Sequence, residues 1–194
     1  MRLPPIPHEK LPPEQQVVDD DMRQEIAKHL KGFVSKRADG ALVGPFAPML
    51  RFPQFGQPAW TYTKALIENS KLPKRPHEVA ILVTGACFNS RYELYAHEQV
   101  AEQAGLSAAQ IAAIAAGQRP SDLGEAEEAA YDVAAVLASG RSLPESTYQR
   151  ALKAFGEEQL AELIYLIGGY CLVSVLLNAY DMSVPGREEG LLHG

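Results

Sequence analysis

The stretch PHEVAILVTGACFNSRYELYAHEQVAEQAGLS, residues 76–107, decides the fold. Its apolar residues fall into two blocks with helical spacing, and Asn89 and Ser90 separate the blocks. Pro76 is favourable at the first position of a helix, and Gly105 is typical of the position after a last turn. The stretch therefore predicts a helical hairpin with helices at 76–88 and 91–104.

Helical patterns continue on both sides of this hairpin. Ser107 has the capping-box spacing to Gln110, and Ser142 repeats that spacing to Glu145. Since no alternating pattern of useful length predicts a strand, we expect an all-α, single-domain helical bundle. The other expected helices are 14–37, 60–68, a short one after Ser107, 126–137, one after Ser142 and 157–182.

Proline and glycine mark the segments that are not expected to be helical. Residues 1–13 hold five of the 14 prolines and predict an extended arm on the surface. Residues 40–58 are irregular, and loops of this length often serve as lids or interface segments. The predicted organisation is an N-terminal arm and helix (1–39), a helical domain (40–185) and a C-terminal tail (186–194).

Composition excludes several classes of protein. The 194 residues carry a net charge of −6 with no long basic run, which argues against nucleic-acid binding. Two cysteines make neither a disulfide framework nor a four-cysteine zinc site. Because the N-terminus also lacks the apolar core of a secretory signal, we expect a cytoplasmic protein.

Residues 163–180 form a run of 18 residues without a charge. Its length is near the lower limit for a membrane span. Glycine, serine and asparagine within the run, and acidic residues at both ends, favour a core or subunit-interface helix instead. A helix that is apolar on every face needs cover on every face, and a second subunit is one source of it.

The hairpin also holds the densest group of polar residues. Glu93 and His97 are four residues apart and therefore share a helix face. A carboxylate beside an imidazole orients it and tunes its pKa, as proton transfer requires. If the two helices pack antiparallel, Glu78 approaches the same point.

Each of these residues also has a purely structural interpretation. Ser90 and Glu93 have capping-box spacing, and Glu78 lies in a first turn, where the helix dipole favours a carboxylate. The zinc motif HExxH fails, because Ala101 replaces its second histidine, so only Glu93, His97 and His77 remain as a weak ligand set. We predict no metal site. His8, His29 and His193 are expected to be exposed and uninvolved, and Cys87 and Cys171 to be buried, inert thiols.

Residues 76–107 resemble the carboxymuconolactone decarboxylase family, which shares its core with the AhpD alkylhydroperoxidases. The resemblance lies in a glutamate opening the first helix, an aromatic-rich start to the second, then Ala-His-Glu and an Ala-Gly-Leu-Ser end. It extends more loosely over 40–185. Peroxidase-type members have a glutamate, a CxxC pair and a histidine four residues after the second cysteine. Glu78 and His97 match that pattern, whereas Ser90 and Glu93 stand at the cysteine positions.

The resemblance therefore implies the decarboxylase branch, a lyase that uses neither a metal nor an organic cofactor. It implies a small carboxylated ring compound from aromatic catabolism as substrate, with a trimer or hexamer as the assembly. His97 is expected to act as general acid/base, with Glu93 as its partner and Glu78 as a second member of the proton relay. The expected substrate-binding residues are Ser90, Tyr92, Tyr95, Arg91 and Arg51.

Two alternatives stay open. One is an AhpD-like peroxidase, although serine and glutamate cannot replace the thiolate and resolving thiol of that chemistry. The other is an oligomeric binding protein that has kept the fold without the reaction. It predicts that Glu78, Glu93 and His97 do not converge. No nucleic-acid or membrane partner is expected.

Overall fold

The computed structural model describes residues 1–29 and 32–185. Within these ranges the chain is all-α, with one isolated antiparallel bridge between Lys36 and Leu42 and no strand. The predicted tail at 186–194, with His193, lies outside the described residues. The elements are η1 (His8–Lys10), α1 (Pro13–His29), α2 (Phe46–Arg51), α3 (Pro53–Glu68), α4 (Lys74–Cys87), α5 (Arg91–Gln103), α6 (Ala108–Ala115), α7 (Glu125–Leu137) and α8 (Glu145–Ala179).

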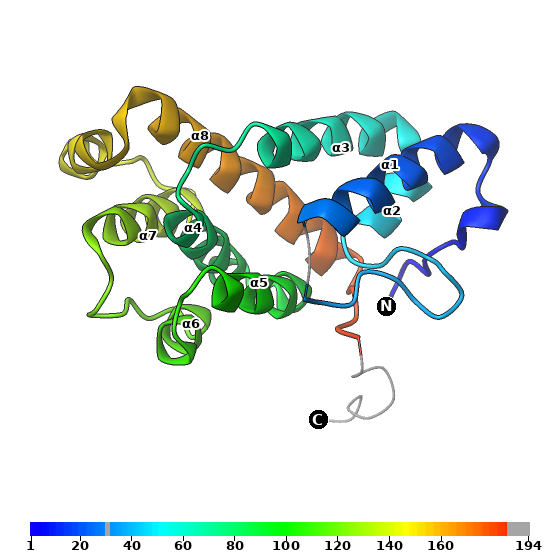
Figure 1. Ribbon diagram of the computed structural model, residues 1–194, viewed down its shortest axis with the longest axis horizontal. Helices are drawn as coiled ribbons and strands as arrows, with labels where there is room; N and C mark the ends of the chain where they lie inside the picture. The colour runs from blue at the N-terminus through cyan, green and yellow to red at the C-terminus, as the bar shows by residue number, and fades with distance from the viewer. Residues whose placement is uncertain (30–31, 186–194) are drawn as a thin grey trace.

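Helix α8 runs through the middle of the molecule (Figure 1). Helices α4 to α7 lie on one side of it, and α1 to α3 lie on the other. One apolar cluster joins α4, α6 and α7 to the first part of α8, around Ile81, Val133 and Leu163. A second cluster joins α1, α2 and α3 to the end of α8, around Met22, Trp60 and Val173. The site described below lies where these two clusters meet.

The predicted hairpin is present, with small shifts at its ends. Helix α4 begins at Lys74, so Pro76 takes the third helical position, where a missing N–H also costs no intrahelical bond. Asn89 adopts a left-handed φ of 48°, and the Ser90 N–H donates to the Gly85 carbonyl across the turn. The capping box of Ser107 and Gln110 is confirmed.

The prediction that residues 40–58 are irregular is wrong for the second half of this segment. Helix α2 occupies part of it, and α3 begins at Pro53 rather than near Trp60. The two helices pack so closely that a Cβ atom on Gly56 would overlap the backbone of Met49. Proline and glycine here serve a helix start and a helix crossing, which local sequence does not distinguish from a loop.

Two further helix ends differ from the prediction. Helix α1 ends at His29 rather than near residue 37, and Gly32 follows with a φ of 103°. Helix α8 begins after Pro144, without a cap from Ser142. Gly156, with a φ of 71°, breaks α8 into the two predicted helical parts. By length and apolar composition α8 is also a candidate membrane span, with 44% of its most apolar window buried in the fold.

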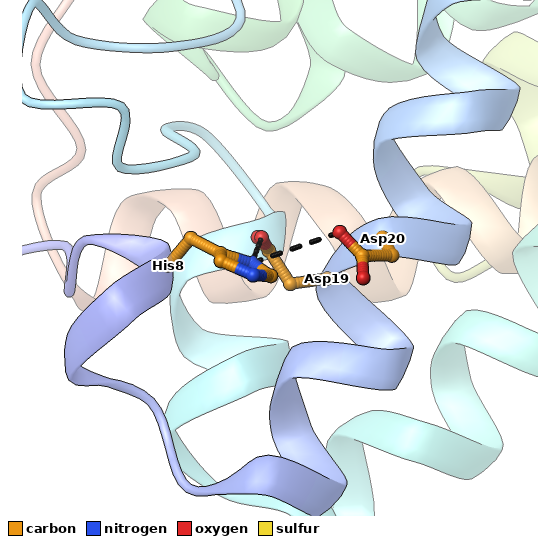
Figure 2. Close-up of side chains that lie close together, drawn as sticks. All are labelled: His8, Asp19 and Asp20. Atoms are coloured by element: carbon orange, nitrogen blue, oxygen red, sulfur yellow. Dashed lines mark hydrogen bonds and ion pairs between the residues drawn. The ribbon is translucent and has the colours of Figure 1, made fainter.

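The N-terminal arm lies against the end of α8 and against α1. The Arg2 N–H and guanidinium donate to the carbonyls of Tyr180 and Ala179, and Leu11 is buried. Figure 2 shows a second attachment, in which the buried Asp19 of α1 accepts from His8 at 2.7 Å. His8 is thus half-buried instead of exposed as predicted, because its ring fastens the arm to the helix.

Candidate active site

Close packing of α4 against α5 brings the polar residues together. A Cβ atom on Gly85 would lie 3.3 Å from Cγ of Glu93, so glycine at this position lets the two helices approach closely. The antiparallel hairpin then places Glu78 of α4 opposite His97 of α5. Glu78, Glu93 and His97 do converge. The active-site hypothesis predicts this convergence, whereas the binding-protein alternative predicts that the three residues lie apart.

His97 lies between the two carboxylates. Its Nδ1 atom is 2.8 Å from Oε2 of Glu78, and its Nε2 atom is 3.3 Å from Oε1 of Glu93. The other Glu78 oxygen, Oε1, lies 3.1 Å from Nδ1 of His77. Glu78 and Glu93 are 3% exposed and His97 is 6% exposed, so the three side chains interact almost without solvent screening.

The capping-box interpretation of Ser90 and Glu93 is wrong. Ser90 is the N-cap of α5, but its side chain makes no cap hydrogen bond and its buried hydroxyl has no partner among the described residues. The Glu93 carboxylate faces His97 instead of the start of its own helix. Its burial is therefore connected with the imidazole and not with helix capping.

The environment separates the pKa values of the two glutamates. Burial alone would raise the pKa of Glu78, but the charges and hydrogen bonds of His97 and His77 lower it to about 2. For Glu93, burial dominates and raises the pKa to about 7, although His97 opposes this effect. Burial acts to lower the pKa of His97, yet the adjacent carboxylates outweigh it and the pKa is raised. Near neutral pH these shifts favour the ionised form of Glu78 and the protonated form of His97, and the pKa of Glu93 lies close to the ambient pH.

Two adjacent cavities meet at this group. The larger one has a volume of about 260 Å³ and reaches Glu78 and His97, and the smaller one has about 40 Å³ and reaches Glu93 and His97. His97, Thr63, Ile67 and Tyr170 line both. An enclosed space of about 150 Å³ suffices for benzene. The larger cavity therefore has room for a single substituted ring.

About half of the residues that line the larger cavity lie outside the hairpin that the sequence connected with the site. Tyr170 of α8 stands edge-on to His97, with ring centroids 5.1 Å apart and ring planes at 89°. Leu66 and Ile67 of α3 and Leu166 of α8 supply apolar wall. His29, predicted to be uninvolved, lies at the rim. These residues reach the cavity only through tertiary packing, which the sequence does not show. The one sequence feature that points to the cavity is the position of Tyr170 within an otherwise apolar run.

Most of the predicted substrate-binding residues lie elsewhere. Arg51 is exposed, and Arg91 is exposed and pairs with Asp181 at 2.7 Å on the outer surface. The Tyr95 hydroxyl accepts from the Val34 N–H, away from both cavities. Ser90 lines neither cavity. Tyr92 does line the smaller cavity, but its hydroxyl donates to the Val34 carbonyl.

Histidine and acidic groups come within metal-ligand spacing at a different place in the described chain. The ligand atoms of His8, Asp19 and Asp20 lie within 4.8 Å of one another. However, Asp19 already accepts from His8 (Figure 2). It also accepts from Nε of Arg23 at 2.6 Å, so its charge is balanced by protein groups. We interpret this cluster as a structural attachment of the arm.

The cysteines lie apart from the cavities. Cys87 at the end of α4 is exposed, contrary to the prediction that it is buried, and Cys171 of α8 is half-buried. Burial raises the pKa of both thiols, which lowers the thiolate fraction at neutral pH. Among the described residues, no cysteine lines either cavity.

The chain is an all-α protein, and its similarity to a solved AhpD core gives it the AhpD-like fold. Residues 53–136 match the model of the carboxymuconolactone decarboxylase family. The helices that carry Glu78, Glu93 and His97 thus lie within the matched residues. The match covers a shorter range than the resemblance over 40–185 that the sequence predicts.

Solved structures share the fold along nearly the whole chain at low sequence identity. A cysteine-to-alanine variant of the debrominase Bmp8, in complex with 2,3,4-tribromopyrrole, is 16% identical with a TM-score of 0.73, over 96% of this chain and 92% of that one. A peroxidase-related protein from Ralstonia eutropha JMP134, described as an AhpD core, is 14% identical with a TM-score of 0.73, over 95% and 92%. Another peroxidase-related protein, from Silicibacter sp. TM1040, is 14% identical with a TM-score of 0.71, over 100% and 95%. No curated protein sequence matches the chain.

Proposed function

We propose that the protein is a cofactor-free lyase that decarboxylates a small carboxylated ring compound by proton transfer. The observation that carries this proposal is the buried contact of His97 with Glu78 and Glu93 at the end of a largely apolar cavity. Such a cavity holds a ring, and a protonated imidazole supplies the proton that replaces carbon dioxide.

His97, Glu93 and Glu78 each have a separate role in one proton transfer. When the carbon–carbon bond to the carboxylate breaks, its electron pair stays on the ring compound and carbon dioxide leaves. A proton then passes from Nε2 of His97 to carbon. Glu93, with a pKa of about 7, returns a proton to Nε2, while the ionised Glu78 holds Nδ1 and stabilises the imidazolium.

The test is a decarboxylation screen over carboxylated lactones and β-keto acids, with carbon dioxide release as the readout. Wild type is compared with His97→Ala, and Arg51→Ala serves as the control because Arg51 is exposed and outside both cavities. We expect His97→Ala to lose at least 100-fold in rate, as is typical for removal of a general acid. Equal activity of wild type and His97→Ala would remove His97 from the mechanism.

Thiol chemistry is the second candidate, because peroxidase-related proteins and a debrominase share the fold. The positions of Cys87 and Cys171 outside both cavities count against it here. Consumption of an organic hydroperoxide with dithiothreitol separates the two functions. Peroxidase activity that disappears in Cys87→Ser would favour the thiol mechanism over ours.

We also propose that α8 mediates self-association. Its exposed side carries a stripe of large apolar residues without a charge, and such a stripe is typical of subunit interfaces. The stripe consists of Ile164, Tyr165, Leu172 and Val175.

A further inference from the structure

One side of the first turns of α4 forms a wall of the larger cavity. Lys74, His77 and Glu78 have the i, i+3 and i+4 spacing of a single helix face, and all three line the cavity. Lys74 is exposed, His77 is half-buried and Glu78 is buried. This face therefore leads from solvent at Lys74 to the floor of the cavity at Glu78.

Lys74 differs from its basic neighbours in having no acidic partner. Lys71 pairs with Glu158 at 2.6 Å, and Arg75 pairs with Glu127 at 2.5 Å. Lys74 forms no ion pair with any carboxylate of the described chain, and it is the one lysine or arginine that lines the larger cavity there. Its ammonium group is thus available to an anion entering the cavity.

The charges of the floor favour one orientation of such an anion. The ionised Glu78 repels a carboxylate that keeps its charge, whereas this repulsion is relieved for a carboxylate that leaves as neutral carbon dioxide. The apolar walls accept a ring. Four residues of helix advance by about 6 Å, so a group at Lys74 lies roughly one ring away from the level of Glu78. An anionic ring compound would therefore place its charge at the mouth and the opposite edge of its ring near His97.

We propose that Lys74 binds an anionic substituent of the substrate at the mouth of the cavity. This inference rests on the proposed function and deepens it. The substrate class becomes a ring compound that carries an anionic group about one ring width from the reacting carbon. The group held by Lys74 is distinct from the carboxylate that leaves, because an ion pair stabilises a carboxylate against departure.

The test uses benzoate as the anionic probe and benzamide as its neutral counterpart, with titration calorimetry at low salt. We expect Lys74→Met to weaken benzoate binding about threefold to tenfold and Lys74→Arg to retain it. Benzamide binding should stay unchanged in both variants. Lys71→Met is the matched control, since it removes the same charge three residues away at a side chain outside the cavity. A benzoate-induced shift of the His97 ring resonances, seen by NMR, locates the probe.

Three outcomes would overturn the proposal. They are wild-type protein that fails to bind benzoate, Lys74→Met that binds it as well as wild type, and equal weakening by Lys71→Met. Benzoate binding requires no bond cleavage, so this test is independent of the decarboxylation screen. Lys74-dependent binding without any carbon dioxide release would count against the proposed reaction and leave the anion site standing.

Discussion

Glu78 and His97 lie 19 positions apart and are joined by a buried 2.8 Å hydrogen bond between Oε2 and Nδ1. This bond links α4 to α5 and fixes the orientation of the imidazole. It also makes the stability of the hairpin depend on the protonation of two groups.

We expect Glu78→Gln to destabilise the protein most between about pH 4.5 and 6.5. The lowered pKa of Glu78 makes its contribution complete above its ordinary value of 4.5 and lost as the pH falls toward about 2. The raised pKa of His97 makes its contribution complete below 6.5 and lost as the pH rises through the folded value. Breaking such a buried pair costs about 3 kcal/mol. Thermal unfolding across this range, with NMR titration of His97, measures both effects, and an unchanged His97 pKa in the variant would refute the assignment.

Glu93→Gln should have the opposite effect on stability at alkaline pH. Because burial raises the pKa of Glu93 to about 7, its ionised form is costly in the folded state, and that cost is complete above pH 7 and absent near pH 4.5. The variant should gain at least about 1 kcal/mol, or about 2–4 °C in Tm, at pH 8, and almost nothing at pH 4.5. Decarboxylation should nevertheless fall. Differential scanning calorimetry at the two pH values decides, and equal Tm changes at both would contradict the prediction.

The attachment of the arm should depend on Asp19 far more than on Asp20. Asp19 is fully buried with partners in His8 and Arg23, whereas the Asp20 side chain is 58% exposed. We expect Asp19→Asn to cost about 3 kcal/mol, because it leaves Arg23 without its carboxylate. Asp20→Asn should stay within about 0.5 kcal/mol of wild type. Urea unfolding of the two variants provides the comparison, and similar losses would show that the buried pair is not what holds the arm.

Leu172→Glu should shift the protein toward the monomer. The substitution places a charge in the middle of the exposed stripe on α8, where a subunit interface cannot solvate it. Val17→Glu is the control, since Val17 of α1 is an equally apolar residue, 70% exposed, outside the stripe. Light scattering after size-exclusion chromatography gives the mass of each variant. A monomeric wild type, or an unchanged mass for Leu172→Glu, would contradict self-association through this face.

Local sequence was sufficient for the hairpin and for the residues that form the buried group. Helical periodicity with a two-residue break predicts antiparallel helices, and the spacing of Glu93 and His97 then defines the shared face. The same reasoning ranked Glu93 as the closer partner of His97, while the shorter contact belongs to Glu78. That order depends on helix packing at Gly85, which periodicity does not contain.

The cavity wall was beyond what local sequence could predict. Arg51 and Arg91 are reasonable anion-binding residues by charge, but neither lines the cavities. Arg51 lies at the exposed end of α2, and Arg91 pairs with Asp181 on the surface. Lys74 was not predicted, because it is one of three neighbouring basic residues, with Lys71 and Arg75. What distinguishes Lys74 is that the other two have acidic partners in the fold, and the sequence does not show these contacts. The sequence of residues 45–58 predicts an irregular segment, because proline and glycine are common both at helix starts and in loops.

Helix α8 supplies Tyr170 to the cavity on one side and the apolar stripe on another. An insertion or deletion of one residue within it would rotate everything that follows by about 100°. An insertion between Gly156 and Tyr170 would turn the Tyr170 ring away from His97 and bring stripe residues into the core. Divergent sequences of this fold are thus expected to vary along this helix by substitution, with gaps in their alignments confined to positions outside residues 157–177.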